Sequence, residues 1–114
     1  MKLSSAIAFL TAVASVSAKD WDLCCCHQNH ICHDPSTRGV VNKSNEFGKP
    51  FHMTVSYYSK QYDGAPFTCT GCYAYHEGAK ISGKEMHKMC KTYGVPGFGG
   101  SMCFNRKRNP DTRW

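Results

Sequence analysis

The sequence lacks several features that would direct it to a membrane. It has no second long apolar segment after residues 1–18, and its C-terminus carries no lipid-anchor signal. A membrane-spanning helix needs roughly 20 consecutive apolar residues, so no span is expected beyond residue 18. The chain also has no internal repeat and no room for a second domain. Acidic residues are few: 8 Asp and Glu stand against 14 Lys and Arg, for a formal charge of +6.

The N-terminal residues have the pattern of a secretory signal peptide. Lys2 supplies the charged region, residues 3–16 are apolar or small, and Val16-Ser17-Ala18 is a small-x-Ala cleavage site. The apolar run is too short to favour a membrane span. We therefore expect a signal peptide at residues 1–18, a secreted and extracellular product, one domain over residues 19–105 and a basic, flexible tail over residues 106–114.

Cysteine is abundant for a chain of this length. The eight cysteines are Cys24, Cys25, Cys26, Cys32, Cys69, Cys72, Cys90 and Cys103. An even number of cysteines behind an export signal predicts four disulfides and no free thiol. Such bridges compensate for the modest core of a small domain. The sequence does not determine the pairing, but three consecutive cysteines are expected to reach three different places.

One helix has clear start and stop signals. Ser82 followed by Glu85 forms a capping box, and Met86, Met89, Cys90 and Tyr93 make an apolar stripe at helical spacing. Gly94 is placed where a helix-ending residue with positive φ is favoured, and Pro96 prevents continuation. The sequence thus predicts a helix over residues 83–93. Cys90 on its buried stripe is expected to bond to a strand or to the 24–26 cluster.

Strands are expected on both sides of this helix. Residues 51–58 alternate apolar and polar side chains, and residues 67–76 form a second candidate, joined to the first by the turn residues 63–66. A short strand is expected at residues 101–105 and another at residues 39–41, while residues 34–37 and 42–50 read as turns. The predicted fold is α+β: a small disulfide-rich domain with an antiparallel sheet and one helix packed on a face.

Clusters of cysteine and histidine suggest metal binding or redox chemistry, but the export signal and the predicted strands argue against both. His27, His30 and His33 lie among the N-terminal cysteines, and Cys69 and Cys72 form a C-x-x-C motif. In an exported protein these cysteines are expected to be disulfide-bonded rather than to bind zinc. A C-x-x-C exchange motif normally opens a helix, whereas this one falls on a predicted strand. We therefore expect no metal site and no cofactor. Incidental Cu or Zn binding by His27, His30 and His33 stays open.

Several residues of the chain could take part in acid–base catalysis, which makes a small secreted hydrolase one of the functions to consider. Small secreted ribonucleases use His, Glu and Arg, and this chain has His52, His76, Glu77 and Arg106 on or beside predicted strands. No motif fixes their mutual geometry, so solvent-facing polar positions are the favoured interpretation. An enzyme is accordingly not the primary expectation.

Four further surface features are candidates for interaction or modification. The outer helix face carries a basic ridge of Lys84, His87, Lys88 and Lys91, extended by residues 106–108 if the last strand packs nearby. Asn42 begins a glycosylation sequon, expected on a surface loop. Lys107-Arg108 is a candidate dibasic protease site. Several tyrosines are also expected at the surface, where they suit carbohydrate stacking or a protein interface.

These features together resemble the small secreted cysteine-rich proteins of filamentous fungi. The run GCYAYHEGAKISGKEMHKMCKTYG is similar to the strand-then-helix unit of smut-fungus killer toxins. Hydrophobins also have eight cysteines, but they need two separate Cys-Cys pairs where this chain has one Cys-Cys-Cys. The resemblance implies action outside the fungal cell, on a host or a competitor.

The resulting functional expectation is a secreted, non-enzymatic effector associated with virulence. Its expected partner is a host or competitor protein, a cell-wall polysaccharide or an anionic membrane surface; no nucleic acid is expected, and the protein is expected to be a monomer. The alternative is an antimicrobial or killer-type toxin that acts on membranes or channels through the basic ridge. The second alternative is the ribonuclease-like hydrolase.

Overall fold

The α+β class predicted from the sequence is confirmed by a computed structural model, which describes residues 19–48, 50–97 and 99–107. The described elements are, in order, β1 (Asp20–Trp21), β2 (Leu23–His27), α2 (Asp34–Glu46), β3 (Phe51–Met53), β4 (Tyr57–Tyr58), β5 (Cys69–Thr70), β6 (Ala74–His76), β7 (Ile81–Ser82), α3 (Gly83–Tyr93) and β8 (Gly100–Phe104). The expected signal peptide at residues 1–18 and residues 108–114 of the expected tail lie outside the described residues.

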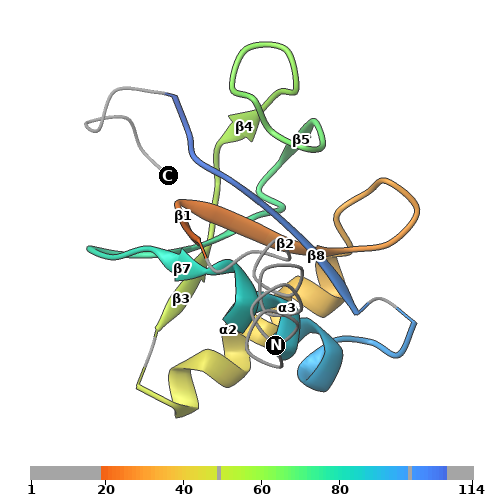
Figure 1. The fold of residues 1–114 in the computed structure, drawn as a ribbon, viewed down its shortest axis with the longest axis vertical. Coiled ribbons are helices and arrows are strands. Elements are labelled where there is room, and N and C mark those ends of the chain that lie inside the picture. Colours follow the sequence, from red (N-terminus) through yellow and green to blue (C-terminus); the bar gives the residue numbers. More distant parts are fainter. Residues whose placement is uncertain (1–18, 49, 98, 108–114) are drawn as a thin grey trace, which may run out of the picture.

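A four-stranded antiparallel sheet organises the domain, with the strand order β3-β6-β2-β8. Two smaller antiparallel pairs, β1 with β7 and β4 with β5, accompany it. Figure 1 shows α2 and α3 together at one end of the molecule and the β4–β5 hairpin at the other end. The expected antiparallel pairing of residues 51–58 with residues 67–76 is confirmed, in two separate pieces: β3 with β6 and β4 with β5.

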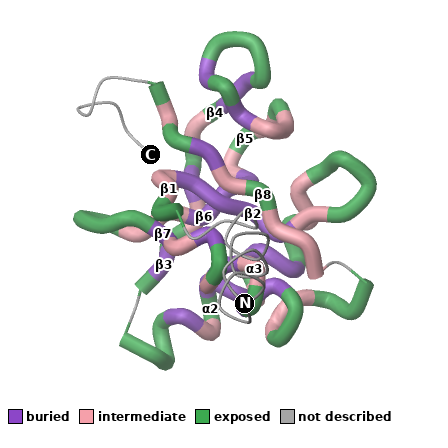
Figure 2. Tube along the Cα trace, viewed as in Figure 1, coloured by how far each residue is buried: buried purple, intermediate pink, exposed green. Residues whose placement is uncertain are grey.

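The central strand β2 divides the interior into two clusters. Alternate residues of a strand point to opposite faces, so Cys24 and Cys26 pack with the helices, whereas Leu23 and Cys25 pack with the hairpin. The helix-side cluster includes Val40, Val41, Phe51, Ile81, Met86, Met89 and Cys90, and the hairpin-side cluster includes Tyr58, Tyr73 and Phe104. Figure 2 shows β2 as a buried stretch that crosses the middle of the fold.

Four disulfides pair all eight cysteines: Cys24–Cys103, Cys25–Cys32, Cys26–Cys90 and Cys69–Cys72. The three consecutive cysteines therefore reach three different segments, and Cys90 bonds to their cluster, both as expected. Bridges that close long loops restrict the unfolded chain most. The two bridges from Cys24 and Cys26 span 79 and 64 residues, so they are the ones that stabilise the tertiary fold most strongly.

Helix α3 has the predicted bounds, and the Oγ of Ser82 accepts a hydrogen bond from the Glu85 amide at 3.2 Å. The reason expected for Gly94 is wrong, because its φ is −78° rather than positive. Glycine is needed here for space. A Cβ on Gly94 would lie 2.5 Å from the Cys90 carbonyl oxygen and 3.2 Å from the Cβ of Ser36 on the neighbouring helix.

Helix α2 was not predicted: it replaces the turn expected at residues 34–37, the strand expected at 39–41 and the first part of the turn expected at 42–50, of which residues 47 and 48 do form a turn. Pro35 lies in its first turn, where the missing amide hydrogen is not needed. Residues such as Val40 and Ser44 have low helix propensity, but tertiary burial outweighs it. Val40 is fully buried, and the Ser44 hydroxyl donates to the Val41 carbonyl and accepts from the Phe51 amide, which fastens the helix to β3.

The strand predicted over residues 51–58 is interrupted at Thr54. The amide of Thr54 donates to the Tyr73 carbonyl at 2.8 Å, and its hydroxyl accepts from the Tyr73 amide at 3.2 Å. After this point the buried face changes: Val55 is 57% exposed, whereas Tyr58 is fully buried. The expected alternation therefore holds for β3 and fails beyond it, since the chain moves from the large sheet to the β4–β5 pair.

Candidate functional site

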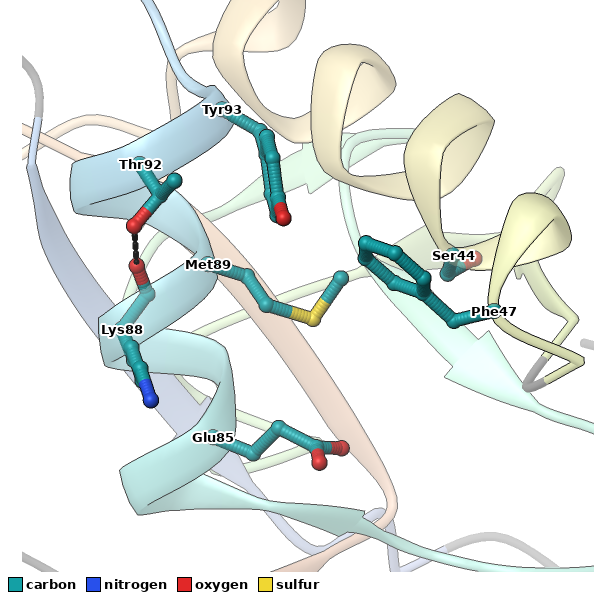
Figure 3. A pocket seen from close by; sticks show the side chains of 7 residues that line it. All are labelled: Ser44, Phe47, Glu85, Lys88, Met89, Thr92 and Tyr93. Atoms are coloured by element: carbon teal, nitrogen blue, oxygen red, sulfur yellow. Dashed lines mark hydrogen bonds between the residues drawn. The ribbon is translucent and has the colours of Figure 1, made fainter.

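A groove of about 300 Å³ opens between α2 and α3, and Figure 3 shows it from close by. The lining residues are Ser44, Phe47, Glu85, Lys88, Met89, Thr92 and Tyr93. The Phe47 ring from the end of α2 and the Met89 side chain from α3 point toward one another across it. Glu85 and Lys88 place opposite charges along the α3 side, so the groove combines an apolar interior with a charged edge.

The close approach of the two helices fixes this groove. Gly39 of α2 lies so near the Tyr93 carbonyl that a Cβ would come within 2.8 Å of its oxygen. The Ser36 hydroxyl accepts a hydrogen bond from the Val95 amide at 2.9 Å, which joins the start of α2 to the segment after α3. One contact involves a glycine and the other the short side chain of the fully buried Ser36, so the spacing of the helices does not depend on long, flexible side chains.

The mouth of the groove exposes aromatic surface. Phe47 is 53% exposed, and its ring centroid lies 5.8 Å from that of Tyr93. The ammonium of Lys43 lies 5.5 Å from the Tyr93 ring centroid and 3.1 Å from a Glu46 carboxylate oxygen. A cation above an aromatic face is attracted by the ring quadrupole. The aromatic pair is thus held in place beside a charged rim.

The predicted basic ridge is only partly formed. Lys84, Lys88 and Lys91 are exposed on α3, and Lys88 also lines the groove. His87 is half-buried and lines a different hollow. Arg106 and Lys107 do not extend the ridge: the Arg106 amide donates to an Asp22 carboxylate oxygen, and a Cβ on Gly64 would lie 3.3 Å from the Lys107 Cε. The end of β8 therefore leads toward the β4–β5 loop, away from α3 (Figure 1).

A second hollow, of about 340 Å³, lies beside the end of β2. Its lining residues are Trp21, His27, His87, Gly100, Ser101, Met102 and Cys103. Burial lowers the pKa of His27 below its usual 6.5, and the nearby His30 and His87 lower it further. The neutral imidazole is therefore favoured at this position, and its Nδ1 is buried without a hydrogen-bond partner.

The histidines of the N-terminal cluster do not gather as metal ligands. The His33 Nδ1 is 2.8 Å from the Ser36 hydroxyl, and His30 is exposed with a φ of 63°. Within residues 19–48, 50–97 and 99–107, the ligand atoms grouped closely enough for a metal ion are the sulfurs of Cys32, Cys69 and Cys72, and all three are in disulfides. Cys69 lies on β5 as expected, whereas Cys72 lies beyond its end.

The histidines considered for a ribonuclease are separated by the strand register. His52 pairs with Tyr75, and His76 pairs with Phe51. Directly paired residues share a face and neighbouring residues do not, so His52 and His76 lie on opposite faces of the sheet. Each ring packs on its own aromatic partner: His52 on Tyr75 at 5.5 Å and His76 on Phe51 at 5.7 Å between centroids. Glu77 is exposed, and Arg106 lies near Asp22.

The remaining surface candidates have mixed outcomes. Asn42 is exposed, but on α2 rather than on the expected loop. Of the tyrosines, Tyr57 and Tyr62 are exposed, while Tyr58 and Tyr73 are fully buried and form edge-on contacts with Phe104. Arg108 of the expected dibasic site lies outside the described residues.

No protein-family model matches the chain, and no curated protein or solved structure is significantly similar to it. In the part of the chain that the structure describes, neither helix has the length and apolar character needed to cross a bilayer. What the chain contains is a small disulfide-rich domain with a groove between its helices.

Sequence reasoning missed the groove because it missed α2. Met89 and Tyr93 were assigned to the core as part of the α3 stripe, and Met89 is indeed 8% exposed. Phe47 belonged to a stretch expected to be a turn. The one available signal was the Asp34-Pro35 helix start followed by Val40 and Val41, whose burial is seen only in the folded chain.

Proposed function

We propose that this protein is secreted and acts outside the cell as a non-enzymatic binding protein of the small cysteine-rich fungal type, with a role in virulence. Four disulfides in a small α+β domain support an extracellular role, because such bridges form and persist in oxidising compartments. The expected partner is a host protein or a wall component.

The observation that carries this proposal is the groove between α2 and α3. Its volume of about 300 Å³ is at the small end of the range for ligand pockets, which suits a single apolar side chain of a partner better than a large cofactor. Exposed aromatic residues are enriched at protein interfaces. Phe47 and Tyr93 would contact this apolar group, and Lys88, which lines the groove, would attract an acidic residue beside it. Lys84 and Lys91 add positive charge on the exposed part of the same helix.

The proposal is tested in the organism that makes the protein. A deletion strain is complemented with the wild type, with Phe47→Ser or with Ile31→Ser, and host colonisation is measured. Ile31 is a matched control, because it is 61% exposed and does not line the groove. Deletion and Phe47→Ser should both reduce colonisation, while Ile31→Ser should restore it. Undiminished colonisation by the deletion strain would refute the function; full rescue by Phe47→Ser would refute the site.

The exposed lysines of α3 favour one alternative, an antimicrobial or killer-type toxin. Lys84, Lys88 and Lys91 present positive charge that an anionic membrane or channel would attract. Oxidised protein should then inhibit competing microbes, and the triple substitution of these lysines by Glu should abolish the inhibition. Inhibition that survives the triple substitution would exclude this mechanism. The ribonuclease alternative is not carried further, since His52 and His76 lie on opposite faces.

A further inference from the structure

Two disulfides that are separate in the covalent structure lie side by side in space. The Sγ atoms of Cys32, Cys69 and Cys72 all lie within 4.8 Å of one another. Cys32 is bonded to Cys25, and Cys69 is bonded to Cys72. The sulfurs of one bridge are thus within a short side-chain movement of the sulfurs of the other. Sulfur atoms at such a distance can exchange partners once one of them becomes a thiolate.

The sheet separates this four-sulfur cluster (Cys25, Cys32, Cys69 and Cys72) from the other two bridges. Cys25 faces the hairpin side of β2, whereas Cys24 and Cys26 face the helices. The clustered bridges also close very short loops, with sequence separations of 7 and 3. Because short loops restrict the unfolded chain less, opening these bridges weakens the fold less than opening Cys24–Cys103 or Cys26–Cys90.

Access to the cluster is asymmetric. Among the three sulfurs that lie together, that of Cys69 on β5 is half-buried, whereas those of Cys32 and Cys72 are buried; Cys25 is fully buried. An external thiol therefore meets Cys69 before the other sulfurs, since reactivity requires that a nucleophile reach the sulfur. Attack at Cys69 releases the Cys72 sulfur, which then reaches the Cys25–Cys32 bridge from inside the protein.

We propose that Cys69–Cys72 is a thiol–disulfide exchange site that transfers reducing equivalents from an external thiol to the Cys25–Cys32 bridge. The reductant is a low-molecular-weight thiol of the glutathione class. Its thiolate attacks the Cys69 Sγ, the Cys69–Cys72 bond breaks, and Cys72 leaves as a thiolate. The Cys72 thiolate then attacks the Cys32 Sγ and forms a Cys32–Cys72 bond. Cys25 leaves as a thiolate and takes up a proton.

A second external thiolate completes the reaction. It attacks the external sulfur of the mixed disulfide on Cys69, which releases the oxidised external disulfide and leaves Cys69 as a thiol. In total, two external thiols lose two electrons and become one disulfide. The protein gains these electrons as two thiols, on Cys25 and Cys69, and retains a new bridge between Cys32 and Cys72. This inference is independent of the groove, and its failure would leave the proposed binding function untouched.

The test is mild reduction of the oxidised wild-type protein with glutathione, followed by acid quenching, alkylation and tryptic mapping by mass spectrometry. Trypsin cuts after Lys19, Arg38, Lys60 and Lys80, so Cys69 and Cys72 share one peptide, 61–80, which contains no other cysteine. In the starting protein this peptide is released alone, because its bridge is internal. After reduction we expect it linked to peptide 20–38, with Cys25 and Cys69 alkylated and Cys24–Cys103 and Cys26–Cys90 intact.

Three other outcomes would overturn the proposal. Peptide 61–80 released alone with both cysteines alkylated would show reduction without exchange. Loss of Cys24–Cys103 or Cys26–Cys90 before any change in peptide 61–80 would show that the reductant enters elsewhere. A parallel reaction in urea identifies scrambling of the unfolded chain: a link that forms only in urea would also refute the exchange. The matched control is Cys25→Ala/Cys32→Ala, in which peptide 61–80 should remain unlinked.

Discussion

Gly39 of α2 lies directly against the carbonyl group of Tyr93 at the end of α3. A methyl group at Gly39 would come within 2.8 Å of that oxygen, which is backbone and has little freedom to move. The two helices that form the groove are therefore as close as a residue without a side chain allows. Phe47 and Met89 face each other across the groove because the helices are held at this spacing.

Gly39→Ala should destabilise the protein, although alanine is the better helix former. Helix propensity favours alanine by about 1 kcal/mol, while forcing a methyl group into a packed contact costs about 1 to 3 kcal/mol. We expect a net loss of about 1 kcal/mol in the free energy of unfolding, measured in urea with the disulfides intact. Asn42→Ala, at an exposed position of the same helix, is the control and should change stability little. A more stable Gly39→Ala variant would show that the helices can separate freely.

Tyr73→Phe should lower the free energy of unfolding more than the removal of an exposed tyrosine hydroxyl does. The Tyr73 hydroxyl donates to the Phe67 carbonyl at 2.6 Å and accepts from the Phe67 amide at 3.0 Å, so its removal leaves two backbone groups without this partner. A loss of about 1 to 3 kcal/mol in unfolding free energy is expected. Burial raises the pKa of Tyr73 to about 12, so the variant should also lose tyrosine absorbance change near that pH. Tyr62→Phe, at a site that is 75% exposed, is the matched control, and an equal effect there would contradict this explanation.

The bridges should differ in their contribution to stability according to loop length. Replacing both Cys26 and Cys90 by alanine removes a bridge that spans 64 residues, whereas replacing both Cys69 and Cys72 removes one that spans 3. Loop entropy predicts a loss of about 4 kcal/mol for the first pair and about 2 kcal/mol for the second. Urea unfolding of the two double variants provides the comparison. Equal losses would mean that packing around the sulfurs, rather than loop closure, determines the contribution.

Stability should fall in mildly acidic solution because of His27. Its pKa is lowered in the folded protein, mainly by burial, so the unfolded chain binds a proton more readily below pH 6.5. Above that pH both states carry a neutral imidazole and the contribution vanishes. As the pH falls through 6.5 toward the lowered folded value, the unfolded state gains stability relative to the folded one. His27→Gln should therefore show a smaller loss of stability between about pH 7 and pH 5 than the wild type.

The measurement for His27 is urea unfolding at several pH values in this range, with His52→Gln as the comparison. His52 is exposed on β3 and lies outside the hollow that contains His27. If both variants reduce the pH dependence to the same extent, burial of His27 is not its origin.

The elements that could be predicted are those with local signals. Ser82, Glu85 and the stripe from Met86 to Tyr93 define α3 within the sequence, and caps act over a single turn. The antiparallel pairing of residues 51–58 with residues 67–76 was also predictable, since alternation and turn residues lie close together in the chain. Helix α2 had no comparable signal, because Val40 and Ser44 become favourable in a helix only after they are buried. Phe47, and with it the groove, was missed for the same reason.

The sequence by itself determined that the chain would be a small disulfide-rich α+β domain and that Cys24, Cys25 and Cys26 would reach three separate places. Three consecutive cysteines cannot easily bond one another, and the cysteine count, the helix cap and the strand alternation are all local features of the chain. Only the tertiary structure decided which cysteines pair, where the strand after Met53 changes sheet, and that His52 and His76 lie apart. Those outcomes depend on register and on packing between distant segments, in which burial outweighs the preferences of single residues.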